Sequence, residues 1–512
     1  MHARAGDAGV IPLTPDDDCT ALVAASPAGS TFLFAPGLYR LKQMLVARTG
    51  DTFLGDSAHP GDVILTGARL IAADLVTPTP TPGVYAAPNR TETEGTLPSH
   101  PCASGFSRCN FAQDLYVDGA PQLHVGSAAK VVAGCACFHF DYSNQQILFA
   151  PAEPTAAHVF ELGVTRAAIS SANSKPPAPD TAAGVTVANL TVRHFANPAQ
   201  FGAVGDQYPG AGWVVSNVNA TLNHGSGAKV HTGGRLLSST FVRNGQMGAG
   251  STGYGGGRGS DVEMGGCELA HNNYAGYSTG WEAGAGKFSS LDGAVLRDNY
   301  VHDNFGHGLW ADVDGVNYTY HGNLVVNNTG PGIAHEISWA AAVVNNTLCF
   351  NGADQDTWLW GGQVQVQNSR GVEVRGNVAV VSGDFGNGIA LLFQDRGNGT
   401  QGVYATLNAT IVGNTVVVLG PQGGFGFTGG VANVATAQGV NTSLMFSSAA
   451  VDGNSYHFEA PDVHHKNATQ RPLFQWAGNN RATWVDWQAC GNDRGGSVHA
   501  LVPGVVPAAC YA

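Results

Sequence analysis

Short runs in which apolar and polar residues alternate return along the chain between residues 184 and 420. Each run reads as a brief apolar strand, a turn with Asn or a small residue, and a second apolar strand, as in LRDNYVHDNFG, YHGNLVVNNTG and VVNNTLCFNG. Alternation with a period of two is typical of β-strands, because successive side chains point to opposite faces. The pattern therefore predicts many short strands, about three to a repeat.

The repeat length indicates how these strands are arranged. Asn299, Asn323 and Asn346 occupy the same turn position and are 24 and 23 residues apart. A unit of this size cannot bury its own apolar face, so neighbouring units must stack. Asn tolerates left-handed turns and can bond a neighbouring backbone, so stacked Asn side chains should form an amide ladder. We predict an all-β fold, a parallel β-solenoid.

The repeats resemble those of the right-handed parallel β-helix superfamily, the pectate-lyase-like fold. Three further segments are similar to parts of these proteins: 21–56 to the first coil, 115–125 with 138–154 to an inserted β-rich subdomain, and 474–496 to the C-terminal cap. The resemblance implies a right-handed parallel β-helix with that insert and that cap. It also implies a relation to secreted polysaccharide lyases, hydrolases and epimerases, although one fold hosts many chemistries.

Changes in composition divide the chain into four expected segments. Residues 1–84 should form N-terminal coils, and 85–183 an inserted β-rich subdomain with a Pro-rich linker. Residues 184–440 should form the main β-helix. Residues 441–512 should cover its open end, since an uncovered end presents unpaired strand edges.

Composition excludes several classes of function. Charged residues make up 12% of the chain, the formal charge is −13, and only six lysines are present. A basic field for nucleic acid is therefore absent, and helical bundles or disorder do not fit. No run reaches the ~18 apolar residues of a membrane span. The first ten residues lack the apolar core of a signal peptide, so we expect a mature or truncated form.

Asparagine sequons and cysteines favour export to the extracellular space or cell wall. Ten Asn-x-Ser/Thr sequons occur, which predicts a glycoprotein, at positions 89, 189, 219, 317, 327, 345, 398, 408, 441 and 467. Nine cysteines favour disulfides, and we expect Cys102–Cys109 and Cys490–Cys510. Two cysteines inside the repeats should be buried thiols: Cys267 and Cys349.

Candidate chemistry comes from aligning the outward faces of successive repeats. In GLWADVDG (308–315) we take Leu309, Ala311 and Val313 as inward, and in GIAHEIS (332–338) the same parity puts His335 inside. Asp312 and Glu336 then share one outward column on adjacent strands, which lie ~4.8 Å apart. Other candidates join this patch: Glu282, Lys287, His335, Trp281, Trp310 and Asp314.

Residue type suggests a role for each candidate. Lys287, Asp312, Glu336, Glu282 and His335 are candidate catalytic residues. Sugars stack on indoles, so we expect substrate binding from three side chains: Trp281, Trp310 and Asp314. The metal site is unknown, and a divalent cation such as Ca²⁺ is a candidate cofactor.

We favour a polysaccharide lyase or epimerase that acts on a glycan bound along the outward strand face. Lys287 or His335 would be the base, and a cation held by Asp312 and Glu336 would neutralise a uronate. The alternatives are a glycoside hydrolase with Asp312 and Glu336 as its carboxylate pair, and a glycan-binding or cell-wall protein without catalysis. The motifs of calcium-dependent pectate lyases and of polygalacturonases (NTD…DD…GHG) are not recognisable. We expect a monomer.

Overall fold

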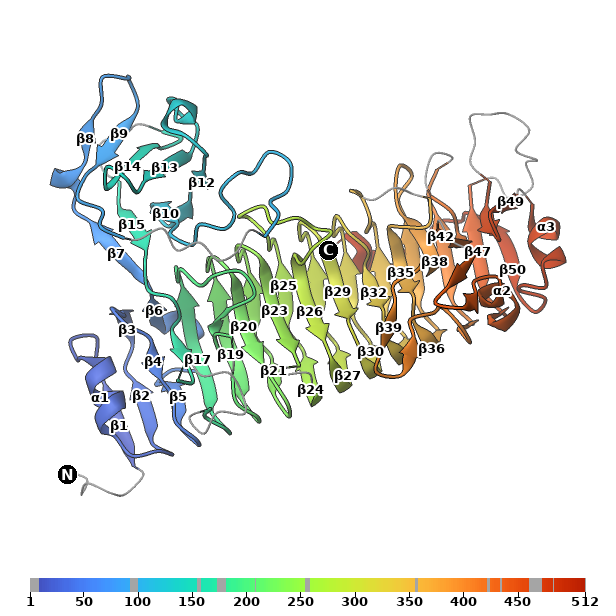
Figure 1. The fold of residues 1–512 in the computed structure, drawn as a ribbon, viewed down its shortest axis with the longest axis horizontal. Helices are drawn as coiled ribbons and strands as arrows, with labels where there is room; N and C mark the ends of the chain where they lie inside the picture. Colours follow the sequence, from blue (N-terminus) through green and yellow to red (C-terminus); the bar gives the residue numbers. More distant parts are fainter. Residues whose placement is uncertain are drawn as a thin grey trace. The chain divides into compact units, whose positions relative to one another are not determined.

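The computed structural model describes residues 9–92, 100–153, 158–172, 181–207, 209–253, 258–354, 358–420, 424–432, 435–459, 472–481 and 483–511. The chain divides into two compact units (Figure 1). Unit 1 comprises Met1–His231, Arg235–Gly250 and His271–Ala283, and unit 2 comprises Thr232–Gly234, Ser251–Ala270 and Gly284–Ala512. These units cut across the four segments expected from composition.

Unit 1 begins with strand β1 (Val10–Leu13) and helix α1 (Cys19–Ala25), whose first turn is capped by the Asp18 side chain. Parallel strands then stack coil on coil. One sheet contains β2 (Thr31–Phe34), β5 (Thr52–Gly55), β17 (Thr186–Arg193), β19 (Val214–Thr221), β21 (Arg235–Leu237) and β22 (Thr240–Val242), and β3 (Gly37–Arg40) and β6 (Val63–Thr66) extend it. A second contains β4 (Leu45–Val46), β16 (Ile169–Ser170), β18 (Gly202–Val204) and β20 (Ser226–Val230).

Two small sheets form the predicted β-rich insert within unit 1. The first contains β7 (Ala68–Ile71), β15 (Phe160–Gly163), β10 (Leu115–Val117) and β11 (Ala120–Pro121). The second contains β8 (Thr77–Pro78), β9 (Tyr85–Ala87), β14 (Gln146–Ala150), β13 (Cys137–Asp141) and β12 (Leu123–His124). Phe138, Phe149 and Leu115 lie in their shared apolar core. The insert includes strands that precede residue 85.

In unit 2 the coils contribute two successive strands of the large sheet and a strand of a second sheet. The first strands are β24 (Gly259–Gly265), β27 (Leu291–Arg297), β30 (Val316–His321), β33 (Trp339–Val344), β36 (Arg370–Arg375), β41 (Thr410–Val412) and β46 (Ala450–Asp452). The second strands are β25 (Glu268–Ala270), β28 (Tyr300–His302), β31 (Leu324–Val326), β34 (Thr347–Cys349), β37 (Val378–Val381), β42 (Thr415–Val418), β47 (Ser455–Phe458) and β50 (Ser497–Ala500).

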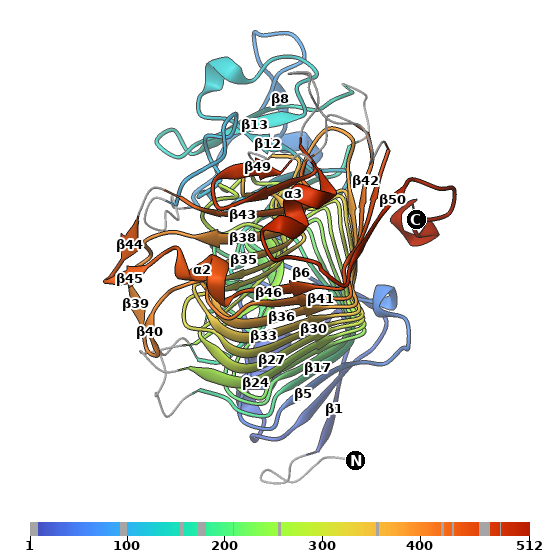
Figure 2. The ribbon, with the colours of Figure 1, turned by 90° about the vertical axis from the view of Figure 1, so that its right-hand side faces the viewer.

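Eight further strands of unit 2 belong to the sheet that carries the candidate site. They are β26 (Gly284–Ser289), β29 (His307–Asp312), β32 (Ile333–Glu336), β35 (Gly362–Gln367), β38 (Asn387–Phe393), β43 (Phe427–Val431), β48 (Phe474–Trp476) and β49 (Asn479–Arg481). Figure 2 shows β35, β38 and β43 in one layer and β33, β36 and β41 in another. Inward side chains such as Leu309, Ile333 and Val364 fill the space between the layers.

The predicted amide ladder is confirmed in unit 2. Asn299, Asn323, Asn346, Asn377, Asn414 and Asn454 each donate Nδ2 to the side-chain oxygen of the next coil, at 2.8–2.9 Å. The last step ends on Asp493, whose other oxygen accepts from Tyr456 and Trp487. A carboxylate can only accept, so it closes a chain of amides that all donate in one direction.

The cap and tail of unit 2 cover its end and one outer stripe. Helix α3 (Trp484–Ala489) buries Trp487 against Phe427, Phe474 and Trp476. The tail after β50 then packs on outward apolar residues of β31, β34, β37 and β42. No helix among the described residues is long and apolar enough to cross a membrane.

The cysteine predictions are partly confirmed. Cys102–Cys109 forms a disulfide as expected, and Cys267 is a buried thiol. Two expectations are wrong because the tail returns along the coil: Cys510 pairs with Cys349, which is therefore no free core thiol, and Cys490 is unpaired. The structure also pairs the cysteines of the Cys-x-Cys motif, Cys135 and Cys137.

Candidate functional site

Strands β26, β29 and β32 of unit 2 place four of the candidates on one face. Lys287 lies opposite Trp310, and Ala311 lies opposite His335, so the next pair in register is Asp312 and Glu336. The expected column of two carboxylates on adjacent strands is therefore present. Parallel strands lie ~4.8 Å apart, so the two carboxyl groups are near neighbours.

Lys287 binds one oxygen of Asp312 and one face of Trp310. Its Nζ lies 2.7 Å from Asp312 Oδ2 and 4.1 Å from the centroid of the Trp310 ring. The His307 ring also stacks on this indole, with 4.1 Å between the ring centroids. Burial and the nearby Lys287 charge lower the pKa of His307 to about 3, so His307 is a neutral packing partner.

Glu336 accepts hydrogen bonds from three directions. Trp310 Nε1 donates to its Oε2 at 3.1 Å, Gln367 Nε2 donates to its Oε1 at 3.2 Å, and the Arg396 guanidinium binds the same Oε1. Gln365 in turn donates to Gln367 at 3.0 Å. These contacts fix the carboxyl group in position, which a catalytic group requires.

Arg396 reaches Glu336 from a loop that the structure ties down. The hairpin β39 (Asn398–Gly399) and β40 (Gly402–Val403) follows Arg396 directly. Asp314 Oδ1 accepts from the backbone N–H of Thr400 at 3.0 Å and from Tyr404 Oη at 2.8 Å. Arg258 binds the Asp314 carbonyl oxygen at 2.8 Å and also Thr400.

Burial sets the electrostatics of the cluster. The side chains of Lys287, Asp312 and Glu336 are only 9%, 11% and 11% exposed. Burial and the negative charge of Asp312 raise the pKa of Glu336, and Arg396 opposes part of that rise. A carboxyl group with a raised pKa beside an ion-paired carboxylate is the arrangement that separates an acid from a nucleophile or base.

Asp312 keeps one oxygen unused within the described part of the chain. Its Oδ2 pairs with Lys287, whereas its buried Oδ1 has no hydrogen-bond partner there. A buried acceptor without a partner costs about 1–3 kcal/mol, so such atoms are rare and need an explanation.

Two of the candidates on unit 2 do not join this cluster. His335 is buried beside Tyr318 and Tyr320, where burial lowers its pKa to about 3. Asp314 does not continue the outward column, because β29 ends at Asp312 and both Val313 and Asp314 have positive φ. The inward position we expected for Val313 is wrong, since it is exposed in this turn. Asp314 instead anchors the hairpin.

The last two candidates belong to unit 1. The Glu282 carboxylate binds the Gln200 side chain, and its carbonyl oxygen accepts from Gln246 at 2.8 Å. Trp281 stacks on His100, with 3.9 Å between ring centroids, and packs near the Cys102–Cys109 disulfide. Both residues therefore have structural partners within unit 1.

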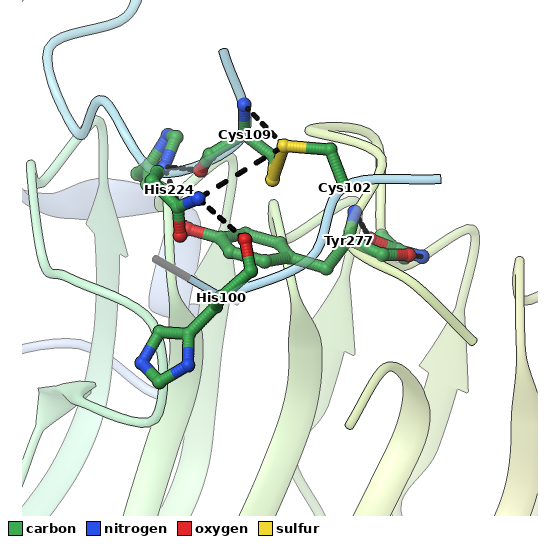
Figure 3. Close-up of a disulfide and its surroundings, with 7 residues drawn as sticks. His100, Cys102, Cys109, His224 and Tyr277 are labelled. Atoms are coloured by element: carbon green, nitrogen blue, oxygen red, sulfur yellow. Dashed lines mark hydrogen bonds between the residues drawn. A yellow bond between two sulfur atoms is a disulfide. The ribbon is translucent and has the colours of Figure 1, made fainter. Parts of the chain in front are cut away.

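A buried polar cluster of unit 1 was missed from the sequence. His224 Nδ1 lies 2.8 Å from Asp114. Its Nε2 lies 2.8 Å from the Cys109 carbonyl oxygen and 3.1 Å from Tyr277 Oη (Figure 3). Burial alone would lower the pKa of His224, but the Asp114 carboxylate outweighs it and raises that pKa. This ion pair joins the insert to the coil, and its full burial points to a structural role.

The comparisons with known proteins identify the fold. Residues 207–416 match the family model described as a right handed beta helix region. A solved structure described as XylC in complex with xylose is similar, with 11% identity and a TM-score of 0.58 over 94% of this chain and 82% of that chain. The chain is a right-handed parallel β-helix protein. No curated protein sequence matches it.

Two more solved structures align with this β-helix protein over most of its length. One is described as a glycoside hydrolase, with 9% identity, a TM-score of 0.48 and 98% of each chain covered. The other is the A-module of mannuronan C-5 epimerase AlgE4 from Azotobacter vinelandii, with 10% identity, a TM-score of 0.42, and 95% and 94% covered.

The residues around the carboxylate pair do not fit the cation we considered. Lys287 occupies one oxygen of Asp312, and Arg396 occupies one oxygen of Glu336. These two side chains supply the positive charge that a divalent cation such as Ca²⁺ would bring. We therefore derive no step through a metal ion.

The sequence reading overlooked the residues that complete the site of the β-helix protein. Gln365 and Gln367 lie on β35, in the columns of Ala334 and Glu336. Extending the outward column by one more coil would have found them. Arg396 follows the aligned strand 388–395 and is one of 24 Lys and Arg residues in the chain, which was a weak signal.

Proposed function

We propose that the β-helix protein is a glycoside hydrolase that cleaves with retention of configuration, with Asp312 as nucleophile and Glu336 as acid and base. The observation that carries this is the pairing of a carboxyl group whose pKa is raised with an adjacent, lysine-bound carboxylate that keeps one oxygen unpaired. Retaining glycosidases need two carboxyl groups about 5–5.5 Å apart, close to the strand spacing of ~4.8 Å.

Each residue then has a defined task. Glu336, whose raised pKa favours the acid form, gives its proton to the leaving oxygen, while Asp312 Oδ1 attacks the anomeric carbon. Lys287 holds Oδ2, which leaves Oδ1 free to react. Once Asp312 is esterified its charge is gone, so the pKa of Glu336 falls and Arg396 favours the carboxylate. Glu336 can then deprotonate the water that releases the sugar.

The lyase or epimerase reading receives less support. It requires a base for the C5 proton, and both candidates are unsuited. Lys287 is held in an ion pair with Asp312, and His335 is in the apolar interior. A uronate would also bring a further negative charge next to Asp312 and Glu336, in a cluster whose cations are already paired.

A neutral glycan is the substrate class that fits this mechanism, and we place its site of action outside the cell. The solved structure described as XylC was determined with xylose, which makes xylosides a reasonable first substrate to test. Three disulfides among the described residues fit an oxidising compartment. We keep export and glycosylation as proposals.

An activity assay tests this function. The native chain is incubated with aryl glycosides and neutral polysaccharides, and products are read by aglycone release, by reducing ends and by NMR of the first anomer formed. We expect retention, and Asp312→Asn and Glu336→Gln should each lower kcat by roughly 10³-fold or more. Glu373→Gln is the matched control, because the Glu373 side chain is 44% exposed on β36 and its carboxylate pairs with Arg375.

Other outcomes point elsewhere. Product absorbance of unsaturated uronates from polygalacturonate or alginate would replace hydrolysis with elimination. An inverted first anomer would refute the nucleophile role of Asp312. Saturable glycan binding without any turnover would make the protein a binding module.

A further inference from the structure

A pair of tryptophans flanks Leu359, which packs on β38 of the sheet that carries the carboxylate pair. The segment Trp358-Leu359-Trp360 precedes β35, and its two indole rings are 5.6 Å apart at 52°. Trp358 is 39% exposed, which is unusual for so large an apolar side chain. The two rings are therefore presented at an angle to each other at the surface of unit 2.

Leu359 fixes this pair to the outer face of the sheet. Its side chain is fully buried against Ala390, Leu392 and Ala432, although its backbone adopts φ +70°. A left-handed conformation costs a leucine roughly 1–2 kcal/mol, and such strain is retained where surrounding packing enforces it. The buried Leu359 side chain thus anchors the segment between the two tryptophans.

The sheet leaves space for the Leu359 side chain because a glycine lies beneath it. Gly430 lies next to Leu392 on β43, and a Cβ added there would come within 2.6 Å of Leu359 Cδ2. Asn387 on β38 donates to the Trp360 carbonyl oxygen at 2.6 Å, which fixes the end of the segment. The tryptophans are therefore held rigidly, and less conformational entropy is lost when a ligand binds.

The register relates the pair to the carboxylates. Ala390 continues the column of Ala334 through Gln365, and Leu392 continues the column of Glu336 through Gln367. Ala390 and Leu392, on which Leu359 packs, therefore lie two strand spacings, ~10 Å, from the strand of Glu336, a distance that a short oligosaccharide spans. An indole offers a flat apolar surface to the C–H face of a sugar ring and an N–H to its hydroxyl groups.

We propose that Trp358 and Trp360 form a remote subsite that binds a sugar unit of the same glycan chain whose bond lies at Asp312 and Glu336. This inference rests on the proposed function for the identity of the ligand. It adds that the natural substrate is an oligosaccharide or polysaccharide, since a monoglycoside cannot reach both places.

Binding is measured in a Glu336→Gln background, so that cleavage does not interfere. The probes are xylohexaose, cellohexaose and laminarihexaose and the corresponding monosaccharides, followed by calorimetry and tryptophan fluorescence. We expect at least one hexasaccharide to bind more tightly than its monosaccharide, and Trp358→Ala to weaken that binding roughly tenfold. Trp358→Phe should recover part of the loss, and Gly430→Ala should mimic it by displacing Leu359.

The control and the contrary results separate this inference from the proposed function. Val485→Ala removes an exposed apolar side chain on α3 and should change nothing. Unchanged hexasaccharide affinity in Trp358→Ala, or no hexasaccharide binding at all, overturns the subsite. If binding depends on Trp358 while the native chain cleaves none of the probes, the subsite holds and hydrolysis falls. If the native chain cleaves monoglycosides while Trp358→Ala leaves hexasaccharide binding unchanged, hydrolysis holds and the subsite is refuted.

Discussion

Replacing one amide of the buried ladder should destabilise unit 2 far more than an ordinary substitution. In the native protein Asn377 Oδ1 accepts from the backbone N–H and the Nδ2 of Asn346, both at 2.9 Å. Its Nδ2 donates to Asn414 Oδ1 at 2.9 Å and to the Val343 carbonyl oxygen at 2.8 Å. Asn377→Ala removes these four bonds and a fifth, longer one from Nδ2 to the Arg375 carbonyl oxygen at 3.3 Å, all at a buried residue.

The magnitude follows from what is left behind. The backbone N–H of Asn346 loses its side-chain acceptor, while its Nδ2 keeps the Tyr320 carbonyl oxygen at 3.0 Å. A buried polar group without a partner costs about 1–3 kcal/mol, and the carbonyl of Val343 loses a donor as well. We expect a loss of roughly 3–5 kcal/mol in the free energy of unfolding, at the extreme of single substitutions.

Urea unfolding followed by tryptophan fluorescence measures this loss. Asn398→Ala is the control, because Asn398 is exposed on β39, and it should change stability by no more than about 0.5 kcal/mol. Asn377→Asp is a sharper test. Its ionised oxygens cannot donate to Asn414, so stability should recover as pH falls and the acid becomes a donor. A loss below about 1 kcal/mol in Asn377→Ala would refute the view that the ladder is a major source of stability.

Two more predictions concern unit 2. Cys349 and Cys510 are 161 residues apart, so the variant with both replaced by Ser should lose up to about 5 kcal/mol of loop-closure stabilisation and release the tail. Thermal melting and limited proteolysis measure these two effects. Cys490→Ser is the control and should melt like the native chain. Because the pKa of Glu336 is raised above its usual 4.5, the folded state binds that proton more tightly than the unfolded state. Native stability should therefore fall relative to Glu336→Gln as pH rises from about 4.5 through the folded pKa, and a pH-independent difference between their unfolding curves would contradict the raised pKa.

The fold was predictable because its signals are local and repeated. Period-two alternation defines the strands, and the spacing of Asn299, Asn323 and Asn346 defines the coil and its ladder. The same parity placed Asp312 beside Glu336 and His335 inside. Parity failed at Asp314, because a strand can end in a turn with positive φ, and nothing in the local pattern marks that point.

Long-range partners were not predictable in the same way. The sequence suggested that Cys490 pairs with Cys510 because the two are neighbours in the tail. The tail instead runs back over the apolar stripe on β34 and brings Cys510 to Cys349. Likewise a sequon can mark an exposed turn: Asn317, Asn327 and Asn345 lie at the surface with positive φ, and glycosylation stays a prediction.

The sequence by itself determined the coil, because apolar burial and amide stacking repeat with every turn of the chain and leave a periodic record. Only the tertiary structure decided the chemistry of the site. It brought Arg396 to Glu336 across 60 residues, bound Lys287 to Asp312, and left one oxygen of Asp312 unpaired. These contacts depend on where a loop folds back and on which charged groups are buried together. Each occurs once, so it leaves no periodic pattern in the sequence.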